Sequence, residues 1–213
     1  MRWGQHWRIS GDTYLPKRSL IFQLGSIMPD WFDRHPIHRW VDTKELFLDR
    51  VCKVAQMKPG IRRSWYLGFI AHFACDYCTM AHNEEYYNFY KHRIYEVLAQ
   101  KYDKKIRKEK PGHVKKWMNA VDIRMLQYAE TQGENEAGDD AGTNVTDPIM
   151  PDEASVLRKK ACYAVETCTE KLHTDIAALH SPDWFRDRRV AELDIRYAYA
   201  LLKVMIGLIE GGN

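Results

Sequence analysis

Residues 67–96 read LGFIAHFACDYCTMAHNEEYYNFYKHRIYE, which combines an apolar helical pattern with an ordered series of metal-binding side chains. The series, at spacings that suit helices, consists of His72, Asp76, His82, His92 and Glu96. Residues four apart on a helix lie on one face, so the pair at 72 and 76 and the pair at 92 and 96 can each bind one ion. Imidazoles with carboxylates are the ligands expected for zinc in a hydrolytic site. The stretch therefore predicts a metal enzyme built on helices.

The composition is that of an ordinary globular protein. The chain has 213 residues, of which 45% are hydrophobic and 29% charged, and we expect one domain over 1–213. The net charge of +3 is too small to indicate nucleic-acid or membrane binding. The first residues lack the apolar core of a signal peptide, and no apolar run approaches the ~20 residues of a membrane helix. We therefore expect a cytoplasmic protein with no transmembrane segment.

The pattern beyond residue 40 is helical. Apolar residues recur at spacings of three and four, and no sustained two-residue alternation occurs. We predict an all-α fold, a multi-helix bundle, with helices near 43–57, 62–80, 84–108, 113–131, 152–179 and 187–210. Cys75 and Cys78 form a C-x-x-C inside a predicted helix, where small buried positions are favoured over a redox pair.

The first 60 residues differ in kind. Helix breakers such as Gly25 and Pro36 alternate with aromatics such as Trp7 and Trp40. Aromatics among turns indicate a loop segment wrapped over a helical core. This segment also carries further candidate ligands: His6, Asp30, His35 and His38.

One further stretch, 130–153, is rich in acidic residues and contains no Lys or Arg. It also contains glycines and prolines, so we predict a long loop. A solvated connection between helices is favoured there, and a lid over the site is the alternative.

With these residues in place, the chain resembles the zinc-dependent phospholipase C family, whose superfamily includes fungal zinc nucleases specific for single strands. The matching features are His6 near the start, the sequence LGSIMPD at 24–30, a histidine shortly before Thr43, and the ordered ligands of 72–96. The resemblance covers about residues 1–98. It is closest to small bacterial members that lack a secretion signal.

The resemblance implies metal ions in a cleft between helices. The implied ligands are His6, Asp30, His38, His72, Asp76, His82, His92 and Glu96. One ion would take Asp30, His38, His72 and Asp76, and a second would take His82, His92 and Glu96. Asp76 would bridge to a third with His6. In secreted members an N-terminal Trp also binds the third ion, whereas Trp3 is internal here, so two zinc ions are expected and the third is left open. His38 fits the spacing to Thr43 better than His35, which is kept as the alternative.

The implied activity is hydrolysis of a phosphate ester or phospholipid by metal-activated water attacking a phosphodiester in line. Asp30 is the candidate catalytic residue, because a carboxylate at the edge of the metal site can accept the proton of that water.

Two alternatives are kept. The basic run at 101–116 and the aromatics at 86–90 are compatible with a single-strand nuclease, although a solvated helix end and plain packing are the favoured interpretations of these features. A helical protein that binds metal without catalysis is the other alternative.

Overall fold

The computed structural model describes residues 3–13, 19–32, 39–83, 86, 88–109 and 153–210. Within these ranges every regular element is a helix, which confirms the predicted all-α class. The α-helices are α1 (Trp3–Thr13), α2 (Ser19–Ile27), α3 (Pro29–Phe32), α4 (Trp40–Ala55), α5 (Ile61–Tyr77), α6 (Phe89–Glu109), α8 (Glu153–Ala177) and α9 (Arg188–Glu210). Two short 3-10 turns are η1 (Met80–His82) and η2 (Trp184–Arg186).

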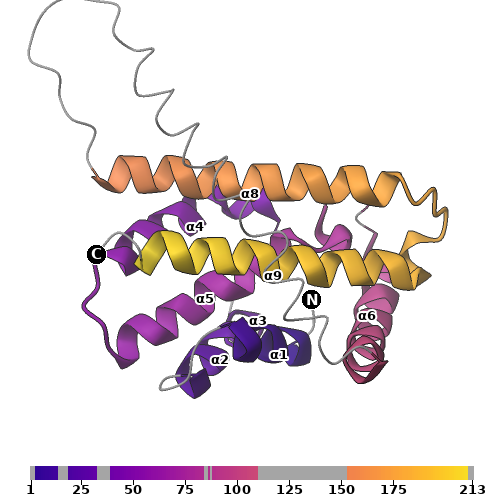
Figure 1. Cartoon of the computed structure of the whole chain (residues 1–213), viewed down its shortest axis with the longest axis horizontal. Coiled ribbons are helices and arrows are strands. Elements are labelled where there is room, and N and C mark those ends of the chain that lie inside the picture. Colours follow the sequence, from indigo (N-terminus) through magenta and orange to yellow (C-terminus); the bar gives the residue numbers. More distant parts are fainter. Residues whose placement is uncertain are drawn as a thin grey trace, which may run out of the picture.

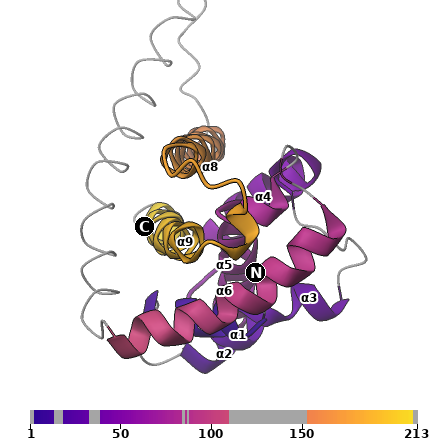
Figure 2. The ribbon, with the colours of Figure 1, turned by 90° about the vertical axis from the view of Figure 1, so that its right-hand side faces the viewer.

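The two longest helices, α8 and α9, run side by side, and α9 lies between α8 and the N-terminal helices (Figure 1). Helix α6 lies across them, since it is seen lengthwise where α8 and α9 are seen nearly end-on (Figure 2). Helices α5 and α9 carry much of the apolar core, which includes Ala71, Phe73, Leu201 and Met205, none more than 1% exposed. None of the described helices combines the length and apolarity needed to cross a bilayer.

Two glycines let α2 and α5 cross in close contact. A Cβ at Gly25 would collide with the carbonyl oxygen of Trp65, and a Cβ at Gly68 would collide with that of Phe22. Both helices therefore need glycine at the crossing, because any larger residue would push the backbones apart. The close crossing brings the end of α2 beside the part of α5 that carries His72.

The expected N-terminal loop is helical over the residues that the structure describes. Gly4 and Gly11 lie inside α1 and Gly25 lies inside α2. A Cβ at Gly25 would collide with backbone, whereas a Cβ at Gly4 or Gly11 would meet the end of a glutamine side chain, which can move aside. These three glycines therefore lie within helices and not at the expected turns. Residues 14–18 and 33–38, where the wrapped-loop prediction could still apply, lie outside the described residues.

The helix boundaries differ from the prediction in one place that matters for the site. Helix α6 begins at Phe89, not at residue 84, because Asn88 Oδ1 accepts the backbone N–H groups of Tyr90 and Lys91 at 3.1 and 3.2 Å. An asparagine in this position is a helix N-cap. The predicted helix at 113–131 lies outside the described residues, as does the acidic stretch up to residue 152. Cys75 and Cys78 are fully buried, as predicted.

Candidate metal centre

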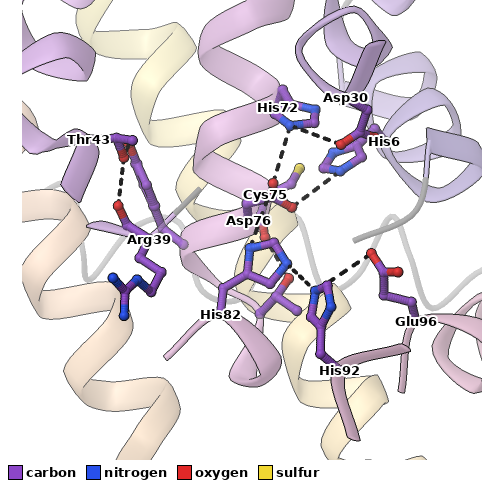
Figure 3. A network of polar contacts seen from close by, with 12 residues as sticks. His6, Asp30, Arg39, Thr43, His72, Cys75, Asp76, His82, His92 and Glu96 are labelled. Carbon is purple, nitrogen blue, oxygen red and sulfur yellow. Dashed lines mark hydrogen bonds and ion pairs between the residues drawn. The ribbon is translucent and has the colours of Figure 1, made fainter. Parts of the chain in front are cut away.

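Among the residues that the structure describes, two groups of three buried side chains bring metal-binding atoms together (Figure 3). The first consists of His6, His72 and Asp76, and the second of His82, His92 and Glu96. Within each group, one ligand atom from each residue lies within 4.8 Å of the others. Helices α1 and α5 supply the first group, while η1 and α6 supply the second. All six predicted ligands that these elements carry therefore converge.

In the first group both oxygens of Asp76 face imidazoles. His72 Nε2 lies 3.2 Å from Asp76 Oδ2, and His6 Nε2 lies 3.3 Å from Asp76 Oδ1. The two imidazole rings stack with their centroids 4.1 Å apart. His72 and Asp76 share one face of α5 because they are four residues apart.

Asp30, on α3, lies at the edge of the first group. Its Oδ1 is 3.6 Å from His72 Nε2, and 31% of its side chain is exposed, whereas His72 is fully buried. The structure thus places the predicted catalytic carboxylate beside the centre with access to solvent.

A backbone carbonyl orients the ring of His72. Its Nδ1 lies 2.9 Å from the carbonyl oxygen of Ser26. The carbonyl can only accept, so Nδ1 carries a proton, and Nε2 faces the carboxylates of Asp76 and Asp30. This second hydrogen bond is the usual device that fixes the tautomer of a metal-binding histidine.

In the second group two imidazoles meet through equivalent atoms. His82 Nε2 and His92 Nε2 are 3.0 Å apart, and His92 Nε2 is 3.8 Å from Glu96 Oε1. Two neutral imidazoles cannot both direct lone pairs at each other without repulsion, so this geometry requires a proton or a cation between them. His82 Nδ1 also lies 3.8 Å from Asp76 Oδ2. Asp76 therefore adjoins both groups.

Burial controls the protonation of the histidines. Desolvation, aided by the neighbouring His72, lowers the pKa of His6 to about 4, and desolvation lowers the pKa of His92 to about 4. For His72 burial acts in the same direction, but the carboxylates of Asp76 and Asp30 outweigh it and raise its pKa. At neutral pH His6 and His92 are thus neutral, which is the form that binds metal.

Burial acts in the opposite direction on the carboxylates. It tends to raise the pKa of Asp76, yet nearby positive groups, including His82 and His72, hold that pKa well below its usual range. For Glu96 burial prevails and raises the pKa. Buried imidazoles around an ionised carboxylate form a donor set that fits zinc.

The predicted loop ligand is not among the residues that the structure describes, which include neither His38 nor His35. His173, which sequence analysis did not single out, belongs to the surroundings of the second group. Its Nδ1 lies 3.1 Å from the side-chain nitrogen of Asn83, the residue that follows His82.

The aromatics near α6 divide into two kinds. Tyr86 packs against Trp184 with ring centroids 6.0 Å apart, as plain packing predicts. Phe89 and Tyr90 are 57% and 76% exposed, so the packing interpretation is wrong for these two.

The basic run is partly used in packing. Arg107 Nε lies 2.7 Å from Asp103 Oδ1, and its guanidinium also contacts Asp12 and Tyr199. Asp103 is 1% exposed and also binds Arg8, so this network fastens α6 to α1 and α9. Residues 110–116 lie outside the described part of the chain.

The fold and these two clusters define a class: an all-α protein with neighbouring groups of imidazoles and carboxylates that could hold metal ions. A family model described as zinc dependent phospholipase C matches residues 7–135, more than half of the chain. The chain therefore belongs to the zinc-dependent phospholipase C family. The matched range contains seven of the predicted ligands, all but His6. Neither a search of curated proteins nor a search of solved structures gave a match.

Proposed function

We propose that this protein is a zinc-dependent phosphodiester hydrolase that acts on a phospholipid or a small phosphate ester. The observation that carries this proposal is the position of Asp76, whose carboxylate adjoins both groups of candidate ligands. Shared carboxylates are what a centre with more than one ion needs, and membership of a zinc-dependent family supports zinc as the metal.

The residues divide into roles. His72, Asp76 and Asp30 would hold one ion, with His38 as the proposed fourth ligand, and His82, His92 and Glu96 would hold a second. His6 faces Oδ1 of Asp76 and would serve a third ion or complete the first. Zinc in such a centre supplies Lewis acidity, which activates water and neutralises phosphate charge.

The protein's own groups supply the remaining chemistry. The backbone carbonyl of Ser26 accepts a hydrogen bond from Nδ1 of His72 and so leaves Nε2 available to bind an ion. Asp30, next to His72 and open to solvent, would accept the proton of the attacking water. Burial of the other carboxylates keeps competing water from their oxygens.

The exposed rings at the start of α6 favour a lipid substrate. Phe89 and Tyr90 precede the ligand His92 by three and two residues, so they lie within a turn of the centre and can contact acyl chains. A single-strand nuclease is not favoured, because Arg107, within the basic run, is already paired with carboxylates.

The test combines metal analysis with hydrolysis. We expect the purified protein to contain zinc and to hydrolyse bis-p-nitrophenyl phosphate, losing activity with a chelator and regaining it with zinc. Release of phosphocholine from phosphatidylcholine, compared with degradation of single-stranded DNA, separates phospholipase from nuclease. Zinc binding without hydrolysis of any of these substrates would instead support a non-catalytic metal-binding protein.

A further inference from the structure

A buried carboxylate on α9 joins the two elements that carry the second group of candidate ligands. Asp194 is 1% exposed, and its Oδ2 accepts the backbone N–H of Met80 at 3.0 Å. The same oxygen accepts the hydroxyl hydrogen of Tyr95. Met80 begins η1, which ends at His82, and Tyr95 directly precedes Glu96 on α6.

The second group needs such a link because its ligands come from separate elements. His82 lies on the short turn η1, while His92 and Glu96 lie on α6. A short 3-10 turn has little rigidity of its own. A hydrogen bond at Met80 and another at Tyr95, both to one oxygen, set the distance between the turn and the helix.

The chemistry of Asp194 indicates more than packing. Its other oxygen, Oδ1, is buried and has no hydrogen-bond partner among the described residues. A buried carboxylate with one unsatisfied oxygen is unfavourable for stability, so an apolar residue would suit this position better if packing were its only role.

We propose that Asp194 is a positioning residue that fixes His82 relative to His92 and Glu96 and thereby sets the affinity of the second group for zinc. The first group is oriented differently, through Ser26, so it does not depend on Asp194. The inference rests on the proposed function only in taking His82, His92 and Glu96 as ligands.

The test removes one hydroxyl group. Tyr95→Phe keeps the ring and deletes the hydrogen bond from α6 to Asp194. Tyr102→Phe is the matched control, because Tyr102 lies on the same helix and its hydroxyl donates instead to the carbonyl oxygen of Arg186, at 2.9 Å. In a competition titration with zinc, we expect Tyr95→Phe to lower the zinc affinity of one class of sites by roughly 10- to 100-fold and to leave the affinity of the other class unchanged. This is the usual effect of losing a hydrogen bond to a metal ligand's surroundings.

A second pair of variants tests the carboxylate itself. Asp194→Asn keeps an oxygen acceptor and should retain most of the zinc affinity that Asp194→Ala loses. A merely structural role predicts a different result: both classes of sites would weaken together, and the melting temperature of the metal-free protein would fall. That result would overturn the proposal, as would unchanged zinc binding in Tyr95→Phe and Asp194→Ala.

Nitrogen-15 chemical shifts of the histidine rings separate this proposal from the proposed function. In the metal-free protein, Tyr95→Phe should change the ring shifts of His82 and His92 but not those of His72. This change, together with a wild-type protein that binds zinc but hydrolyses none of the substrates, would refute the hydrolase and retain the positioning role. Unchanged shifts at His82 and His92 would refute the positioning role.

Discussion

At the residue scale, the proposed metal centre depends on Asp76, because its two oxygens adjoin both groups of candidate ligands. His6 and His72 lie within 3.3 Å of this carboxylate, and His82 lies at 3.8 Å. Removing it would leave the buried imidazoles without their shared anion. Removing His6 would affect only the contact at Oδ1 of Asp76.

We therefore predict that His72→Ala and Asp76→Ala abolish hydrolysis and lose bound zinc, while His6→Ala has a smaller effect. Zinc content and the rate of bis-p-nitrophenyl phosphate hydrolysis measure this. His180→Ala, at an exposed histidine outside the centre, is the control. Full zinc occupancy and full rate in either of the first two variants would show that the assignment is wrong. A loss for His6→Ala equal to that of His72→Ala would mean that a third ion is bound and essential.

The lowered pKa values of two buried histidines also predict that the stability of the metal-free protein depends on pH. The folded-state pKa values of His6 and His92 are about 4, against an ordinary histidine value of 6.5. The unfolded chain therefore binds more protons between these values, and the free energy of unfolding falls as pH falls from about 6.5 to about 4. The lowered pKa of Asp76 acts in the same direction at still lower pH.

The raised pKa values of His72, Glu96 and Asp194, the last raised by burial to about 7, act in the opposite direction, since stability falls as pH rises through each of them. The variant His92→Gln removes one of the two lowered groups. Its free energy of unfolding should therefore fall less, or rise more, between pH 7.0 and pH 5.0 than that of the wild type, as measured by urea unfolding of the metal-free proteins. An identical pH dependence in the two proteins would contradict a neutral buried imidazole at His92.

Residue types and spacing were enough to predict which side chains converge, but not what orients them. The orienting group of His72 is the backbone carbonyl of Ser26, and a carbonyl leaves no mark in a sequence. Asp194 lies 98 residues beyond Glu96, so nothing local connects it to the site.

At the element scale, the crossing of α2 and α5 positions the first group. Gly68→Ala should separate the two helices, weaken the hydrogen bond between Ser26 and His72, and lower the free energy of unfolding by about 1–3 kcal/mol, as overpacking does. Gly207→Ala is the matched control, because Gly207 also lies in a helix and a Cβ there meets nothing within 4 Å. Chemical denaturation measures both, and equal stability of the two variants would contradict the close crossing.

Helix α6 supports a second prediction at this scale. If Phe89 and Tyr90 contact acyl chains, Phe89→Ser with Tyr90→Ser should raise the KM for phosphatidylcholine micelles and leave the hydrolysis of a soluble phosphodiester unchanged. Ile61→Ser, at an exposed apolar residue eleven positions before His72, is the control. An equal loss on both substrates would assign these rings a structural role.

Helix periodicity was sufficient to predict α4, α5, α8 and α9 to within a few residues. Periodicity failed where a capping side chain sets the start of a helix or where a neighbouring helix sets the residue type. Asn88 caps α6 later than periodicity suggests, and Gly25 of α2 serves a contact between helices that are distant in sequence from one another. Such contacts exist only in the folded chain, so composition alone assigned that glycine to a turn.

At the scale of the whole molecule, the fold brings together residues 6, 30, 72–82 and 92–96 from five elements around one carboxylate. Helix α9, which contributes no candidate ligand among the described residues, holds the others through its apolar core and through Asp194. The order of the ligands predicted this convergence through a family resemblance, and the match to the zinc-dependent phospholipase C family confirms that resemblance.

In our proposal these groups form one centre with more than one zinc ion. Anomalous diffraction from a crystal, recorded on both sides of the zinc absorption edge, would locate the ions. We expect one anomalous peak between His72 and Asp76 and another between His82, His92 and Glu96. A zinc-loaded crystal with no peak at either position, or with these imidazoles on separate outer surfaces, would contradict the proposal.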